Sequence, residues 1–132
     1  MRVKSPYHQQ AKEWLKYADY DLLVAKDNFK LGHYSYVCQL CQQAAEKYLK
    51  AFLVAHGKEP KRTHILRELV NDCAQIRPKI KELMSEAKEL EQYYIPTRYP
   101  VGPFGTFGKK DAQAALSAAE HIIKTIKNFL FV

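Results

Sequence analysis

Apolar residues recur every three or four positions over most of the chain, which is the repeat of amphipathic helices. The first such stretch runs from about Tyr7 to Leu31 and is followed by Gly32, a residue suited to the left-handed end of a helix. A second stretch, 35–55, has an apolar stripe wider than a helix needs to cover one side of a core. We therefore expect the second helix to be central, or to be shared with a second subunit.

Three more helices are predicted in the second half of the chain. One begins at Thr63, a good N-cap residue, and ends before Pro78. The next covers 79–94 and has a solvated face of Lys and Glu, and the last opens at Asp111 and is rich in small alanines. About five helices with short connections predict an all-α, up-and-down helical bundle that forms a single domain over residues 1–132.

The segment from Ile95 to Lys110 has neither helical nor strand periodicity. It holds three of the five glycines and three of the six prolines, together with Arg98, Tyr99 and two phenylalanines. Disordered linkers are poor in aromatic residues, and long irregular connections inside compact domains are often functional. We therefore predict an ordered loop that presents Arg98 among aromatic rings.

Composition excludes several classes of protein. No apolar run approaches the roughly 20 residues that cross a bilayer, and the first residues lack the apolar core of a signal peptide, so we expect a cytoplasmic protein without a membrane partner. Three cysteines are too few and odd in number for a secreted disulfide framework. Cys38 and Cys41 have a metal-like spacing, but they lie within a helix and lack a second pair. We predict no metal, and nothing in the sequence indicates a cofactor.

Positive charge is concentrated in one part of the chain. Between Lys47 and Arg67 six basic residues oppose the single acidic residue Glu59, and six minus one leaves +5 of the total net charge of +7. Two of the six, Lys61 and Arg62, directly precede the predicted helix start at Thr63, where free N–H groups and the helix dipole attract phosphate. A solvated basic face that only promotes solubility is the alternative.

These residues suggest a phosphate-binding surface. Arg98 supplies a planar guanidinium for bidentate phosphate contact, and Tyr99 could stack on a base. The predicted nucleotide- or phosphate-binding residues are Arg98, Tyr99, Lys61, Arg62, His64, Lys47 and Lys50.

Other residues have less specific interpretations. His64 could be a catalytic base, a phosphate donor or a residue that packs locally at the helix start, whereas His121 is expected to be partly exposed rather than functional. Glu46 and Lys50, four positions apart, are expected to support their helix. Trp14 and the tyrosines of the first two helices are more typical of a core or an interface than of base-stacking surfaces.

Three blocks of sequence together resemble the HEPN domain (higher eukaryotes and prokaryotes nucleotide-binding). They are C-Q-L-C-Q-Q-A-A-E-K-Y-L-K-A-F-L at 38–53, T-H-I-L-R-E-L at 63–69 and Y-Y-I-P-T-R-Y-P at 93–100, in the order and spacing of that family. The resemblance covers nearly the whole chain and implies a helical bundle with a four-helix core, usually a homodimer. It also implies a minimal nucleotidyltransferase partner, commonly in a toxin and antitoxin pair.

The sequence departs from the ribonuclease motif of that family. Many HEPN proteins are metal-independent ribonucleases in which an arginine is followed four to six residues later by a histidine. Arg98 is followed there by G-P-F-G at 102–105, and the nearest downstream histidine is His121. This form resembles the non-nuclease, nucleotidyltransferase-associated branch, which implies Arg98 as a phosphate ligand and no catalytic residue.

The sequence thus predicts a dimeric, non-catalytic protein that binds a nucleotide or RNA and works with a minimal nucleotidyltransferase. Two alternatives stay open. The chain could be a divergent ribonuclease in which His64 or His121 replaces the missing histidine, or a purely structural subunit whose basic surface docks an acidic protein.

Overall fold

The computed structural model describes residues 7–94 and 107–131, and these residues are almost entirely helical. The elements are α1 (His8–Leu31), α2 (Tyr34–Ala55), α3 (Leu66–Ile76), the 3-10 helix η1 (Pro78–Leu83), α4 (Met84–Glu91) and α5 (Lys109–Phe131). No strand occurs within these two ranges. The predicted all-α bundle is confirmed.

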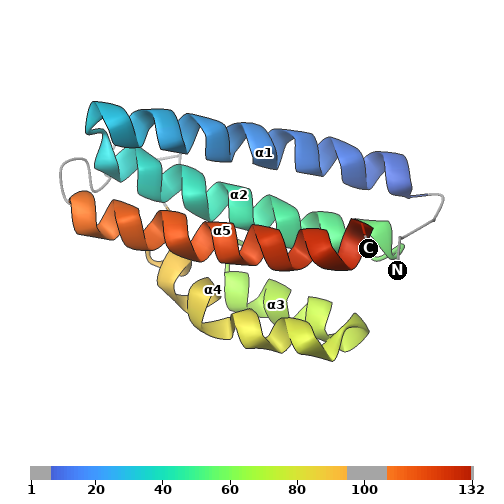
Figure 1. The fold of residues 1–132 in the computed structure, drawn as a ribbon. Coiled ribbons are helices and arrows are strands. Elements are labelled where there is room, and N and C mark those ends of the chain that lie inside the picture. The colour runs from blue at the N-terminus through green and yellow to red at the C-terminus, as the bar shows by residue number, and fades with distance from the viewer. Residues whose placement is uncertain (1–6, 95–106, 132) are drawn as a thin grey trace.

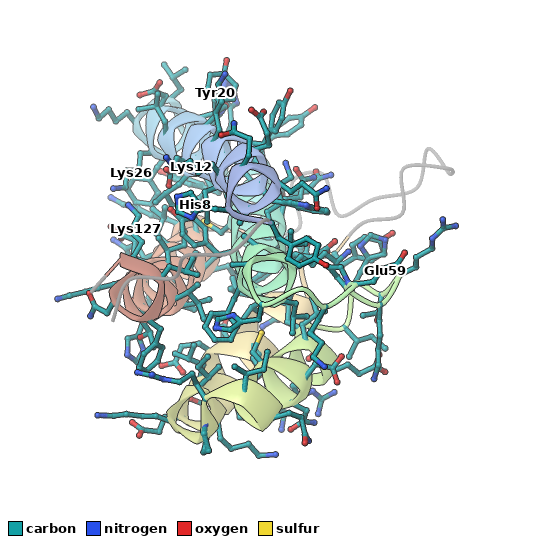
Figure 2. All side chains as sticks on the ribbon, turned by 90° about the vertical axis from the view of Figure 1, so that its right-hand side faces the viewer. His8, Lys12, Tyr20, Lys26, Glu59 and Lys127 are labelled. Atoms are coloured by element: carbon teal, nitrogen blue, oxygen red, sulfur yellow. The ribbon has the colours of Figure 1, made fainter. Side chains whose placement is uncertain are left out.

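Helix α2 occupies the middle of the bundle. The long helices α1, α2 and α5 lie side by side, and α3, η1 and α4 pack beneath them (Figure 1). Seen end-on, α2 has α1, α5 and the α3–α4 layer around it, while the connection that carries Glu59 runs along its remaining side (Figure 2). The wide apolar stripe is therefore used within one chain, which confirms the predicted central position of this helix.

The turn between α1 and α2 forms as the sequence predicts. Gly32 has a φ of 84°, in the left-handed region that favours glycine. The N–H groups of Gly32 and His33 donate to the carbonyls of Phe29 and Asn28, so the last carbonyls of α1 are satisfied. This tight reversal places α1 and α2 as antiparallel neighbours (Figure 1).

Small residues line the contact between α5 and the rest of the bundle. Ala112, Ala115 and Ala119 are fully buried, as is the cysteine pair of α2. Burial raises the pKa of the Cys38 thiol to about 12, so this thiol stays protonated and packs as a small apolar group. The alanines of α5 therefore serve packing within one chain.

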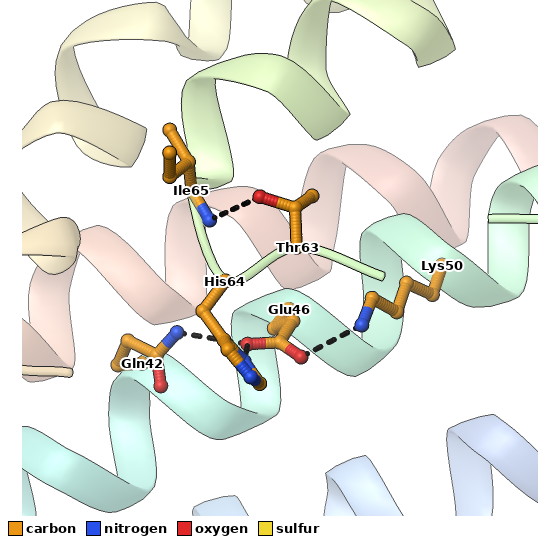
Figure 3. Close-up of polar contacts among 6 residues, drawn as sticks. All are labelled: Gln42, Glu46, Lys50, Thr63, His64 and Ile65. Atoms are coloured by element: carbon orange, nitrogen blue, oxygen red, sulfur yellow. Dashed lines mark hydrogen bonds and ion pairs between the residues drawn. The ribbon is translucent and has the colours of Figure 1, made fainter. Parts of the chain in front are cut away.

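The predicted N-cap of the third helix is wrong by two residues. Thr63 is not its N-cap, because α3 begins at Leu66 with Ile65 in the capping position. The hydroxyl of Thr63 instead accepts a hydrogen bond from the N–H of Ile65 at 3.0 Å, which forms a local turn before the helix (Figure 3). Local turn formation thus competes with capping for the same hydroxyl.

The fourth and fifth helices also differ from the prediction. The expected helix 79–94 is divided into η1 and α4, and Ile80 and Leu83, three residues apart as a 3-10 turn requires, are both buried. Helix α5 begins at Lys109, so Asp111 is in its first turn rather than at its N-cap, and its carboxylate accepts from the N–H of Gly108 at 2.9 Å. This is the backward bond of a capping box.

Most of the predicted proline-glycine loop, 95–110, lies outside the described residues, and its last two residues, Lys109 and Lys110, belong to α5. Arg98 and Tyr99 lie outside the described residues, as does the rest of 95–106. Across the two described ranges, the structure holds no helix with the length and apolar character of a membrane span.

Candidate functional site

The connection from α2 to α3 carries His64 back against α2. Its Nδ1 lies 2.9 Å from Oε1 of Glu46, which is on α2 (Figure 3). The imidazole also stacks on the ring of Tyr94, just after α4, with the ring centroids 4.1 Å apart and the planes at 16°. The side chain of His64 remains 49% exposed. This histidine is therefore fixed from two sides and still accessible to a ligand.

Glu46 is the centre of the polar cluster around His64. Besides His64, its carboxylate accepts from Nε2 of Gln42 at 3.0 Å and from Nζ of Lys50 at 2.9 Å (Figure 3). Burial raises the pKa of this carboxyl, but the hydrogen bonds from His64, Lys50 and Gln42 outweigh burial and leave the pKa below its ordinary value. Glu46 is thus ionised at neutral pH and counters the buried ammonium of Lys50.

The ionised carboxylate determines which ring nitrogen of His64 can meet a ligand. A carboxylate only accepts hydrogen bonds, so Nδ1 of His64 is the donor toward Glu46. Nε2 then accepts a proton or hydrogen bond when the ring is neutral and donates when it is protonated. An imidazole oriented by a carboxylate is suited to hold a phosphate oxygen or to move a proton.

Two exposed cations precede His64 in the same connection. Lys61 has its Nζ 3.5 Å from Oδ1 of Asp72, and both side chains are partly exposed. Arg62 is exposed and has no ion pair among the residues that the structure describes. We call the set Lys61, Arg62, His64, Glu46 and Lys50 the junction site. Of the residues that the sequence singled out, the structure brings His64 and Lys50 together around Glu46, whereas Lys61 and Arg62 are near His64 along the chain.

The predicted excess of free positive charge is largely compensated in three dimensions. Nζ of Lys47 lies 2.5 Å from Oδ2 of Asp21 on α1, and Nε of Arg67 lies 2.8 Å from Oε2 of Glu91 on α4. With the pairs of Lys50 and Lys61, four of the six cations between 47 and 67 contact carboxylates. Counting charge along the sequence missed these partners because they come from distant positions.

The start of α3 does not offer the free N–H groups that were predicted for phosphate. The N–H of Arg67, in the first turn, donates to Oε2 of Glu91 at 2.9 Å. The guanidinium of Arg67 holds the same carboxylate through Nε and Nη2. A carboxylate of the protein therefore takes the position in which an anionic ligand was expected.

His121 is in a different environment from His64. It is exposed on α5, as predicted, and its Nδ1 lies 2.8 Å from Oε2 of Glu86. It lines a cavity of about 450 Å³ whose other walls come from η1, its N-cap and the last turns of α5. His64 and His121, the two histidines of the ribonuclease alternative, therefore contact different glutamates and do not contact each other among the described residues.

No metal site is formed by the cysteines that have metal-like spacing. Cys38 and Cys41 are buried as free thiols. In the described ranges, no three His, Cys, Asp or Glu side chains are grouped so that they could hold an ion.

Sequence reasoning missed the central role of Glu46. Gln42, Glu46 and Lys50 are buried on α2 at successive spacings of four, and only the helix-supporting pair of Glu46 with Lys50 was predicted and is confirmed. Three polar side chains spaced four apart in a helix with a wide apolar stripe were the available signal. Tyr94, which stacks on His64, was interpreted only as the end of a helix.

Comparison with known proteins agrees with this architecture. The HEPN domain family model matches residues 11–129. The protein named "Putative toxin MJ1304" of Methanocaldococcus jannaschii is 31% identical over 133 residues, covering 91% of this chain and 88% of the relative.

Solved structures show the same similarity. TT1696 from Thermus thermophilus superposes with a TM-score of 0.80 at 32% identity, covering 90% of this chain and 97% of that one. ST0689, described as an archaeal HEPN homologue, gives a TM-score of 0.75 at 29% identity, covering 91% and 97%. Because the family model spans nearly all of the described helices and the relatives cover nearly the full chain, this protein belongs to the HEPN domain family.

Proposed function

We propose that this HEPN protein binds the phosphate groups of a nucleotide or RNA at the junction site and does not cleave RNA itself. The observation that carries the proposal is His64, which is fixed by Glu46 and Tyr94 yet half exposed beside Lys61 and Arg62. A preorganised imidazole, whose Nε2 donates to an anion when the ring is protonated, binds that anion beside exposed cations with little further ordering cost. Titration of the wild type, Arg62→Ala and Arg98→Ala with ATP, GTP and a short RNA tests this proposal.

The proposal includes Arg98 and Tyr99 because they follow Tyr94 closely in the sequence. Tyr94 stacks on His64, and Arg98 follows it four residues later in the sequence. We assign bidentate phosphate contact to Arg98 and Arg62, whereas Lys50, already paired with Glu46, fixes the shape of the site.

The proposed setting is a two-component pair with a minimal nucleotidyltransferase. The name of the Methanocaldococcus jannaschii relative supports a toxin context, and the form Y-I-P-T-R-Y-P around Arg98 favours the nucleotidyltransferase-associated branch. In this setting the HEPN chain supplies the nucleotide- or RNA-binding subunit of the pair, in the cytoplasm.

We expect purified protein to leave single-stranded and transfer RNA intact. Arginine stabilises phosphate charge but is a poor proton donor or acceptor at neutral pH, and the motif histidine after Arg98 is absent. The measurement is gel analysis of RNA incubated with protein, with and without EDTA.

A divergent ribonuclease is the second candidate, because the Glu46–His64 contact resembles an oriented general base. Cleavage that survives EDTA and disappears in His64→Ala would establish it. His121→Ala is tested beside it, because His121 is also exposed and paired with a glutamate, and loss of cleavage in that variant would assign the reaction to His121 instead.

We also propose a homodimer, but the exposed residues that support it are on α1 and are not those that the sequence indicated. The stripe of α2 and the alanines of α5 are buried within one chain, whereas Leu23 and Leu31 of α1 are 56% and 71% exposed. Burying such residues in a symmetric interface is a common route to dimers. Light scattering at micromolar concentration should give twice the mass of one chain, and a single-chain mass throughout would contradict the dimer.

A further inference from the structure

A groove between α1 and α2 lies beside the junction site. Its volume is about 420 Å³, and it is lined by Gln10, Glu13, Trp14, Tyr17 and Lys47. This volume is within the range of small-molecule sites in proteins. Of the two predicted settings, core or interface, Trp14 is partly buried against the core, whereas Tyr17 is 61% exposed and is not a core residue. We call this groove the aromatic groove.

Each ring of the aromatic groove has a lysine beside it. Nζ of Lys47 lies 6.0 Å from the centroid of the Tyr17 ring, and Nζ of Lys50 lies 6.0 Å from that of Trp14. Both ammonium groups are held in place by carboxylates, Lys47 by Asp21 and Lys50 by Glu46. Aromatic faces next to fixed cations are the arrangement with which proteins bind the bases of single-stranded nucleic acids.

Lys50 connects the aromatic groove to the junction site. The same ammonium that lies near Trp14 donates to Glu46, and Glu46 in turn accepts from His64. Glu13 in the groove wall repels phosphate, whereas the junction site carries the exposed cations Lys61 and Arg62. The distribution of charge therefore favours the phosphate of a nucleotide at the junction site and its base in the aromatic groove.

We infer that the aromatic groove binds the base of the nucleotide, or of the RNA residue, whose phosphate is held at the junction site. The base stacks on Tyr17 and Trp14, and the amide of Gln10 and the carboxylate of Glu13 are available to its polar edge. This inference rests on the proposed function, since it assigns the base end of the same ligand.

Trp14 makes the test specific to this groove, because it is the only tryptophan in the chain. Fluorescence excited at 295 nm is followed while AMP or ribose 5-phosphate is added, two probes that share sugar and phosphate and differ in the base. AMP should quench Trp14, and ribose 5-phosphate should leave it unchanged. Tyr17→Ala should weaken AMP binding about 5- to 150-fold, as expected for the loss of one stacking partner.

Tyr20→Ala is the matched control, because Tyr20 is on the same helix and 63% exposed but does not line the groove. It should bind AMP as the wild type does. The inference would be overturned if Tyr17→Ala and Tyr20→Ala bound AMP with equal affinity. It would also be overturned if Tyr17→Ala, but not Tyr20→Ala, converted a dimer to monomers, because a second copy of the chain would then cover the groove. AMP and ribose 5-phosphate could instead bind with equal affinity by calorimetry, lose affinity in Arg62→Ala and leave the fluorescence of Trp14 unquenched. In that case the inference fails while the proposed function stands.

Discussion

Glu46→Gln is expected to lower the free energy of unfolding by about 3 kcal/mol, a large effect for one substitution. The substitution keeps the size of the side chain but removes the charge that counters Lys50, which is only 9% exposed. Breaking a buried ion pair leaves the remaining charge desolvated and uncompensated. Urea unfolding of both proteins, followed by circular dichroism, measures the difference.

The control for this prediction is Glu120→Gln. Glu120 pairs with Lys26 at 3.2 Å across α5 and α1, but both side chains are about half exposed. Exposed pairs of this kind contribute at most about 1 kcal/mol. If the two variants unfolded at the same urea concentration, Glu46 would not have the structural role that we assign to it.

The contribution of Glu46 should depend on pH in a defined direction. Because its pKa is lowered in the folded protein, its stabilising effect is fully present above the pKa of an unfolded glutamate, about 4.3. The effect is lost as the pH falls through the folded pKa. The difference in stability between wild type and Glu46→Gln should therefore narrow in acid and stay constant near neutral pH.

The sequence predicted the fold well because the fold depends on local patterns. The apolar repeat defined the helices, the wide stripe of α2 indicated its central place, and Gly32 marked the turn. Helix boundaries were less predictable. The hydroxyl of Thr63 and the carboxylate of Asp111 each had more than one N–H within reach, and the sequence does not say which one they bind.

The candidate site depends on pairs that are distant in sequence, and these limited the prediction. The partners of Lys47 and Arg67 are 26 and 24 positions away, so a local charge count overestimated the free charge. Glu46 was predicted only to support its helix, but it is the centre of the site because it contacts His64, 18 positions away. Arg98 and Tyr99 stay predictions, since they lie outside the described residues.

Loss of nucleotide or RNA binding in Arg98→Ala and Arg62→Ala is the second large effect that we expect. Each guanidinium can make charge-assisted hydrogen bonds to phosphate, and removing such bonds costs about 1.5–3 kcal/mol, or roughly 10- to 150-fold in affinity. Arg98→Lys should also weaken binding, because an ammonium cannot reproduce bidentate contact. Arg77→Ala is the control, since Arg77 is exposed but stacks on Phe129, away from the junction site.

The most direct measurement is a titration of the wild type, Arg62→Ala, Arg98→Ala and Arg77→Ala with ATP, GTP and a short RNA at two salt concentrations. The proposed phosphate site predicts that wild type and Arg77→Ala bind alike and that Arg62→Ala and Arg98→Ala bind more weakly. RNA affinity should fall roughly tenfold or more between 50 and 200 mM salt, as when about three phosphates are neutralised. Equal binding by all four proteins, or no binding by any, would contradict a phosphate site at the junction and favour a structural subunit.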